Sequence, residues 1–147
     1  MMKVIVTGDH AGTTLRNEVK SVLEELGFDY EDTGPDCMSS VDYPDYAVPA
    51  AKRVASGEFD RGIFICGTGI GMSISANKVD GIRCALTHDV FTAKATRQHN
   101  NSNVLAMGER VIGPGLAREI VKTWLTTDYE GGRHELRVEK MMQAEKE

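Results

Sequence analysis

Short apolar runs alternate with amphipathic segments along this chain, and that alternation restricts its fold more than any other feature. KVIVT at 3–7 and RGIFIC at 61–66 are the clearest of the runs. A short run that is apolar at nearly every position suits a strand buried on both faces of a sheet. The runs together predict strands at 3–7, 28–32, 61–66, 82–87 and 104–107.

The segments between the runs have the spacing of helices. In 14–26, apolar side chains recur at helical intervals, and Gly27 follows as a stop signal. Strands that alternate with helices of about ten residues are typical of βαβ units, and hence of a parallel sheet covered by helices on both faces. Helices are expected at 14–26, 46–55, 71–78, 90–98, 116–125 and 133–144.

The size and charge of the chain exclude several kinds of protein. With 147 residues it fits one domain, and a net charge of −5 argues against a broad nucleic-acid surface. No stretch approaches the length of a membrane span, and the N-terminus lacks the apolar core of a signal peptide. Cys37, Cys66 and Cys84 are odd in number and lack CxxC spacing, so we expect reduced thiols and a cytoplasmic protein.

In a parallel sheet, ligands bind at the carboxyl ends of the strands, which directs attention to the loops 8–12, 66–71 and 87–89. In ICGTGIGM at 65–72, three alternate glycines follow Cys66 and lead into a predicted helix. Such a turn can hold an anion or an oxyanion, but neither GxGxxG nor GxxxxGK[ST] is present, which argues against an NAD or ATP site. A tight turn with a buried, inert Cys66 is the structural alternative; Cys37 and Cys84 are both expected to be inert.

Two histidines are candidates for catalysis or substrate binding. Asp9 and His10 end the first strand, where they could face Cys66 or simply form a turn. His99 and Asn100 follow the predicted helix 90–98, where they could also serve as its C-terminal cap. The four histidines of the chain have no metal-ligand spacing, so no metal site is expected.

Three arginines are candidates for binding a phosphate. Arg133 and Arg137 are four residues apart, and hence on one helical face, just after Gly131 and Gly132. A solvated helix with neighbouring glutamates is the alternative for this pattern. Arg110, after the last strand, is the third candidate.

Six motifs in order, spanning nearly the whole chain, resemble the family of ribose, galactose and allose phosphate isomerases, and above all its type B ribose-5-phosphate isomerases. This resemblance implies a Rossmann-like α/β fold, a three-layer α/β/α sandwich around a five-stranded parallel sheet, with residues 1–147 as a single isomerase domain. It also implies active sites shared between the subunits of a homodimer, in some cases paired into a tetramer, and no cofactor. The motifs are GDHAG (8–12), DYPDYA (42–47), ICGTGIGMSISANK (65–78), GIR (81–83), RQHNNSNVLAMGER (97–110) and YEGGRHELRV (129–138).

The resemblance also implies a role for each candidate residue. Cys66 would be the general base that moves a proton between C2 and C1, because Met72 stands where one branch of the family has a glutamate base. His99 would open the sugar ring with help from Asp9, and Asn100 would contact the sugar. The oxyanion would be held by Thr68 and the backbone amides of Gly67, Gly69, Ile70 and Gly71. The phosphate would be bound by His10, Arg133 and Arg137, with Arg110 from the partner subunit.

The function that follows is an aldose–ketose isomerase that interconverts ribose 5-phosphate and ribulose 5-phosphate through an enediolate, in the pentose phosphate pathway. Allose 6-phosphate or galactose 6-phosphate is the alternative substrate. An alternative of another class is a non-catalytic module that binds a phosphosugar. The presence of Cys66 beside Thr68, together with His99 and the arginines, argues against that module.

Overall fold

The computed structural model describes residues 2–36 and 39–147, so the expectation for Cys37 lies outside the described residues. Five parallel strands form one sheet in the order β2-β1-β3-β5-β4. The strands are β1 (Lys3–Gly8), β2 (Asp29–Asp32), β3 (Arg61–Cys66), β4 (Cys84–Leu86) and β5 (Val104–Gly108). The α/β fold and its five-stranded parallel sheet are thus confirmed.

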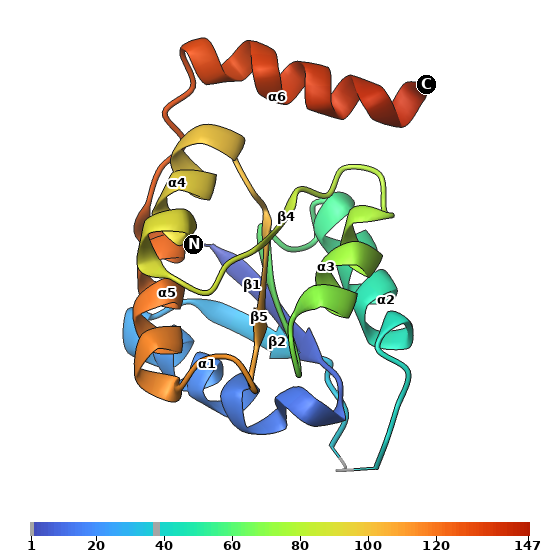
Figure 1. The fold of residues 1–147 in the computed structure, drawn as a ribbon, viewed down its shortest axis with the longest axis vertical. Coiled ribbons are helices and arrows are strands. Elements are labelled where there is room, and N and C mark those ends of the chain that lie inside the picture. Colours follow the sequence, from blue (N-terminus) through green and yellow to red (C-terminus); the bar gives the residue numbers. More distant parts are fainter. Residues whose placement is uncertain (1, 37–38) are drawn as a thin grey trace.

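Helices cover both faces of the sheet, as Figure 1 shows. One face carries α1 (Thr13–Leu26), α4 (Val90–Asn100) and α5 (Pro114–Thr126), and the other carries α2 (Pro44–Ala55) and α3 (Ile70–Asn77). Two short 3-10 turns, His10–Gly12 and Ala144–Lys146, are labelled η1 and η2, and α6 (Arg133–Gln143) lies across the top of Figure 1. No helix of the described chain has both the length and the apolar character needed to cross a membrane.

The strands are buried on both sides because their side chains alternate between two hydrophobic cores. Ile63 and Ile65 of β3 pack into the core under α1 and α5. Phe64 and Cys66 pack into the core under α2 and α3. This alternation explains the almost wholly apolar runs of the sequence, and it places the side chain of Cys66 on the α3 side of the sheet.

Most element boundaries differ from the sequence prediction by one or two residues, and three of these differences matter most. β4 is limited to Cys84–Leu86, and α2 begins earlier than predicted, at Pro44, which suits the first turn of a helix because its ring fixes φ. α4 extends through His99 to Asn100, and Asn101 ends it with a left-handed φ of 50°. His99 and Asn100 are therefore part of the last helical turn and do not follow the helix.

Candidate active site

The glycine loop between β3 and α3 is held in a conformation that needs glycine. Gly69 has a φ of 77°, and a Cβ at this position would lie 2.8 Å from the backbone carbonyl carbon of Met107. A Cβ on Gly71 would lie 2.6 Å from the ring of Tyr43. The loop is thus pressed against β5 on one side and against Tyr43 on the other.

Cys66 sits at the edge of this loop with its sulfur fixed by the backbone. The side chain is 5 % exposed, and the amide of Gly69 donates a hydrogen bond to Sγ at 3.1 Å. The amide of Ile70 likewise donates to Oγ1 of Thr68 at 3.2 Å. The amides of Gly69 and Ile70 therefore already have acceptors inside the loop. That the loop amides and the hydroxyl of Thr68 hold an oxyanion stays a prediction.

A cavity of about 380 Å³ opens over the loop. Its polar walls come from three strand ends, because the carboxyl ends of parallel strands meet at one edge of the sheet. Asp9 and His10 follow β1, Cys66 and Thr68 follow β3, and Arg110 follows β5. Ala11, Tyr43, Gly67, Ile70, Gly71 and Ile74 complete the lining.

Asp9 and His10 are both oriented by backbone hydrogen bonds. A carboxylate oxygen of Asp9 accepts the amide of Ala11 at 2.9 Å. Nδ1 of His10 accepts the amide of Val41 at 3.1 Å, so the proton of a neutral His10 ring is on Nε2. His10 thus retains an N–H donor when it is neutral.

Arg110 lies beside candidate residues of its own chain. The expectation grouped His10 with Arg133 and Arg137 and took Arg110 from the partner subunit. In the structure, Arg110 lines the same cavity as His10 of its own chain. Its amide donates to the carbonyl of Gly67 at 3.0 Å, which ties the end of β5 to the glycine loop.

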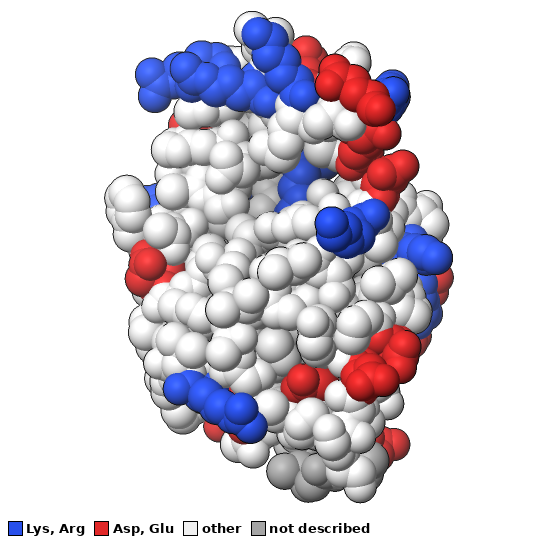
Figure 2. Space-filling model, turned by 45° about the vertical axis from the view of Figure 1, so that its right-hand side comes forward, with Lys and Arg blue, Asp and Glu red and all other residues white. Residues whose placement is uncertain are grey.

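His99, Asn100, Arg133 and Arg137 do not line this cavity. A helix that connects two parallel strands runs opposite to them, so the end of α4 lies at the amino edge of the sheet, whereas Cys66 lies at the carboxyl edge. Arg133 and Arg137 are exposed on α6, where Figure 2 shows Lys and Arg side chains gathered at the top of the molecule. The candidate residues of one chain thus form two separate groups.

The group at the amino edge contains two residues that sequence reasoning did not assign. The rings of His99 and His134 are stacked, with centroids 4.4 Å apart and planes at 18°. Oε1 of Glu130 lies 3.6 Å from Nε2 of His134. Burial above all, and then the proximity of His99 and Arg133, lowers the pKa of His134. In the sequence, His134 was one of several scattered histidines, and only its place beside Arg133 in a matching motif could have drawn attention to it.

A metal would not fit this trio without rearrangement. Ligand atoms of His99, Glu130 and His134 lie within 4.8 Å of one another. Nitrogen ligands around a tetrahedral zinc ion are about 3.3 Å apart and direct their in-plane lone pairs at one point. The planes of the two stacked rings are nearly parallel, so their lone pairs do not converge.

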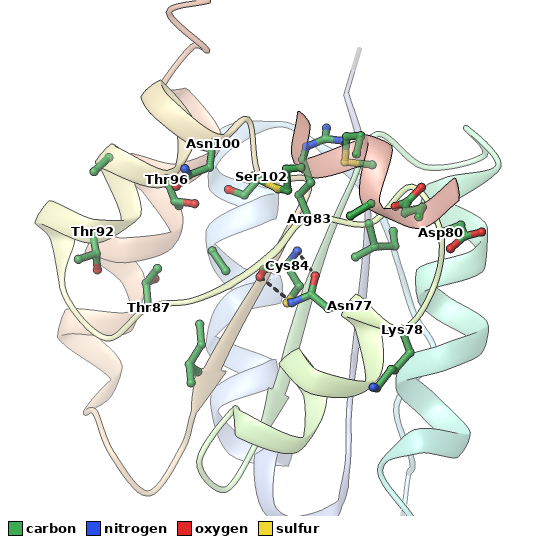
Figure 3. Close-up of a pocket in the computed structure, with 18 residues that line it drawn as sticks. Asn77, Lys78, Asp80, Arg83, Cys84, Thr87, Thr92, Thr96, Asn100 and Ser102 are labelled. Carbon is green, nitrogen blue, oxygen red and sulfur yellow. Dashed lines mark hydrogen bonds between the residues drawn. The ribbon is translucent and has the colours of Figure 1, made fainter. Parts of the chain in front are cut away.

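A larger cavity of about 840 Å³ lies between α3, β4, α4 and α6 (Figure 3). The side chain of Asn77 bridges the backbone of Cys84 here, accepting from its amide at 2.8 Å and donating to its carbonyl at 3.0 Å. Burial raises the pKa of the Cys84 thiol to about 12. So high a pKa favours the protonated thiol at neutral pH, which supports the expectation that Cys84 is inert. Asn100 lines this cavity. It is the one candidate active-site residue that does so among the described residues.

Known proteins resemble this chain over nearly its full length. A family model described as ribose/galactose isomerase matches residues 4–141. A Bacillus subtilis protein, provisionally named a sugar phosphate isomerase, is 67 % identical, and the match covers 95 % of both chains. Ribose-5-phosphate isomerase B of Escherichia coli is 48 % identical over 95 % of this chain and 93 % of its own. A D-erythrulose-4-phosphate isomerase of Pectobacterium atrosepticum is 42 % identical over 96 % and 93 %.

Solved structures give the same result. Ribose-5-phosphate isomerase B of Clostridium thermocellum superposes with a TM-score of 0.96 at 48 % identity, covering 99 % of this chain and 98 % of the other. The Mycoplasma genitalium ribose-5-phosphate isomerase B, with bound ribulose 5-phosphate, has a TM-score of 0.95 at 38 % identity, covering 99 % and 97 %.

Proposed function

Because the chain belongs to the ribose/galactose isomerase family, we propose that it is an aldose–ketose isomerase that interconverts ribose 5-phosphate and ribulose 5-phosphate. The observation that carries the proposal is the cavity in which Cys66 stands beside the glycine loop, with Asp9, His10 and Arg110 around it. We propose that the protein is located in the cytoplasm and acts in the pentose phosphate pathway. Both described cysteines are free, which suits a reducing compartment.

Cys66 is the proposed base of the reaction. As a thiolate it takes the proton from C2 of the open-chain aldose and returns it to C1, while the hydroxyl proton moves from O2 to O1. C1 is thus reduced and C2 oxidised within one molecule, so no cofactor is needed. Thr68 Oγ1 already accepts the amide of Ile70, so its hydroxyl proton is free to be donated to the enediolate oxygen. Met72, which is fully buried, has no group that could compete as a base.

The proposed active site is completed by a second copy of the chain. Within one chain, Cys66 lies at the carboxyl edge of the sheet with Asp9, His10 and Arg110, whereas the other four candidates lie away from this cavity. In a homodimer the partner would bring its own amino-edge group to the cavity of the first chain. Phe91 is 79 % exposed, and Ile70 and Ile74, at the cavity, are also largely exposed, as expected of a face that associates. The candidate residues that the partner would bring are His99, Asn100, Arg133 and Arg137, and two dimers would form the tetramer.

With this arrangement each residue has one task. His99 transfers the proton that opens the furanose ring, with Asp9 assisting, and Asn100 holds a sugar hydroxyl. His10 and Arg110 of one chain meet the phosphate together with Arg133 and Arg137 of the other. The phosphate does not react, and its binding energy orients the reacting end of the sugar.

The decisive test of the proposal is Cys66→Ala. A positioned base contributes about 100-fold or more, so we expect kcat for ribose 5-phosphate to fall by at least about 100-fold, with an unchanged circular dichroism spectrum. Cys84→Ala is the matched control, because that thiol is inert and lies outside the cavity; its kcat should stay within about twofold. If Cys66→Ala retained more than about a tenth of the wild-type kcat, the role of Cys66 as base would be wrong.

The choice of substrate is tested separately. The four-carbon sugar phosphate of the Pectobacterium relative is a second candidate, and allose 6-phosphate and galactose 6-phosphate are the six-carbon candidates. We expect kcat/KM for ribose 5-phosphate to exceed that for each of these sugars by about tenfold or more. With the phosphate bound, a sugar of another length would place its reacting carbon incorrectly relative to the base. Binding of these sugars with no turnover of any of them would support a non-catalytic module instead.

A further inference from the structure

The ring of His99 is backed by another imidazole. Its centroid lies 4.4 Å from that of His134, and the two planes are inclined by 18°. Among the residues that the structure describes, neither ring nitrogen of His99 takes part in a hydrogen bond. The stack is therefore the contact that sets the plane of the His99 ring, and both nitrogens remain free for another molecule.

His134 is a firm support because its own position is fixed. Its ring is buried, with 7 % exposure, whereas that of His99 is only partly covered. Gly131 and Gly132, with φ values of 64° and 55°, turn the chain into α6 so that His134 stands in its first helical turn. The amide of Glu130 donates to the carbonyl of Gln98 at 3.1 Å, which joins this loop to the residue before His99.

The charges around the stack favour a neutral His134. Glu130 raises the pKa of His134, but burial, His99, Arg133 and Arg137 together lower it. A neutral ring can stack on a protonated one without charge repulsion. A neutral His134 therefore adds no charge repulsion to the stack.

We propose that His134 is a positioning residue for His99: its buried ring sets the plane in which the His99 imidazole meets the sugar ring. This rests on the proposed function, in which His99 opens the furanose. A proton donor must approach to about 2.6–3.2 Å in the correct direction, and an unsupported imidazole turns about its Cβ–Cγ bond. Without the stack, a smaller share of His99 rings would face the sugar correctly.

The test compares two reactions that differ only in ring opening. Conversion of ribose 5-phosphate begins with a closed ring, whereas ribulose 5-phosphate has no hydroxyl placed to close one. Its C1 proton exchanges with D₂O through the enediolate alone, which proton NMR follows. For His134→Leu we expect conversion to fall at least about threefold more than exchange, and the split should resemble that of His99→Asn. A smaller difference, or equal losses in both reactions, would overturn the proposal.

Three further variants separate the role of the His134 ring from general stability. His134→Phe restores a flat ring without a titratable group, and it should bring the ratio of the two rates back to within about twofold of wild type. Failure of this rescue would contradict the role of the ring plane. Glu135→Gln, one residue further along α6 and exposed, is the matched control with an unchanged ratio. If leucine prevents folding, His134→Gln is judged by the same criterion.

The proposed function and this inference fail in distinguishable ways. A wild-type protein that neither converts ribose 5-phosphate nor exchanges the C1 proton of ribulose 5-phosphate would contradict both. A wild type active in both reactions, with His134→Leu leaving their ratio unchanged, would contradict only the role of His134.

Discussion

Cys66 and Gly69 depend on each other. The amide of Gly69 fixes the sulfur of Cys66, and that amide is in place because Gly69 takes a left-handed φ in a space where Met107 leaves no room for a side chain. The location of the proposed base is thus set by a backbone conformation that L side chains rarely adopt. Which residue can stand at a given position of this loop therefore depends on the space available as much as on the chemistry of its side chain.

Arg137 of α6 is a single residue with a proposed role in binding the phosphate. We expect Arg137→Ala to raise KM for ribose 5-phosphate by about tenfold or more with a smaller change in kcat, because the lost group binds a part of the substrate that does not react. Steady-state kinetics measures both constants. Lys140→Ala, an exposed cation on the same helix, is the control and should leave KM unchanged. An unchanged KM in Arg137→Ala would mean that Arg137 is only a solvated surface residue.

At the scale of elements, the direction of α4 decides how the site is divided. Its first turn is capped by Asp89, whose carboxylate accepts the amide of Thr92 at 2.7 Å. Its last turn carries His99 and Asn100 to the amino edge of the sheet. Residues at the end of a crossover helix and residues at the end of a strand therefore lie at opposite edges, however close they are in sequence.

The contact between β2 and α1 yields a prediction about acid stability. Asp32 lies 3.0 Å from Nε of Arg16 and 2.8 Å from Nζ of Lys20. Burial alone would raise the pKa of Asp32, but the hydrogen bonds from Lys20 and the Gly34 amide, with the charge of Arg16, lower it overall. A lowered native pKa stabilises the fold above the pKa of the unfolded chain, about 3.9, and this stabilisation is lost as pH falls through the native value.

Asp32→Asn should therefore lower the free energy of unfolding by about 1–3 kcal/mol at pH 7, measured by urea denaturation. The difference in free energy of unfolding between the variant and the wild type should narrow as the pH falls below about 4. Asp29→Asn, on the exposed start of the same strand, is the control with little change. If this difference in free energy of unfolding stayed constant down to about pH 2, the charge of Asp32 would not contribute to stability.

At the scale of the whole molecule, the proposed active site needs two chains. The cavity over the glycine loop contains Cys66, the proposed base, and the other group stands at the opposite edge of the same sheet. A dimer with twofold symmetry would place each group of one chain against the complementary group of its partner, and so form two identical sites.

Mixing two inactive variants tests this arrangement. Cys66→Ala and His99→Asn are each expected to be nearly inactive, but a mixed dimer would contain one site with both residues intact. Refolding the two in equal amounts should recover about a quarter of wild-type activity, since about half of the dimers are mixed and each has one good site. Each variant refolded alone is the control. A mixture no more active than its components would mean that the two residues do not meet across subunits.

Much of the fold could be predicted from the sequence because it depends on local patterns. The apolar runs locate all five strands, and the glycines after Cys66 mark a βα turn. The order of the strands could not be read in this way. β5 lies between β3 and β4, although β4 precedes it in the sequence, and no local pattern records that order.

The sequence by itself determined which residues share the carboxyl edge, since every strand of a parallel sheet ends there: the positions of the apolar runs are enough to group Asp9, His10, Cys66, Thr68 and Arg110. Only the tertiary structure decided that His99 and Asn100 do not belong to that group, and that the ring of His134 lies against that of His99. The physical reason is that strand ends are fixed by local pattern, whereas the side of the molecule reached by the end of a helix, and the rings that stack there, depend on how distant segments pack.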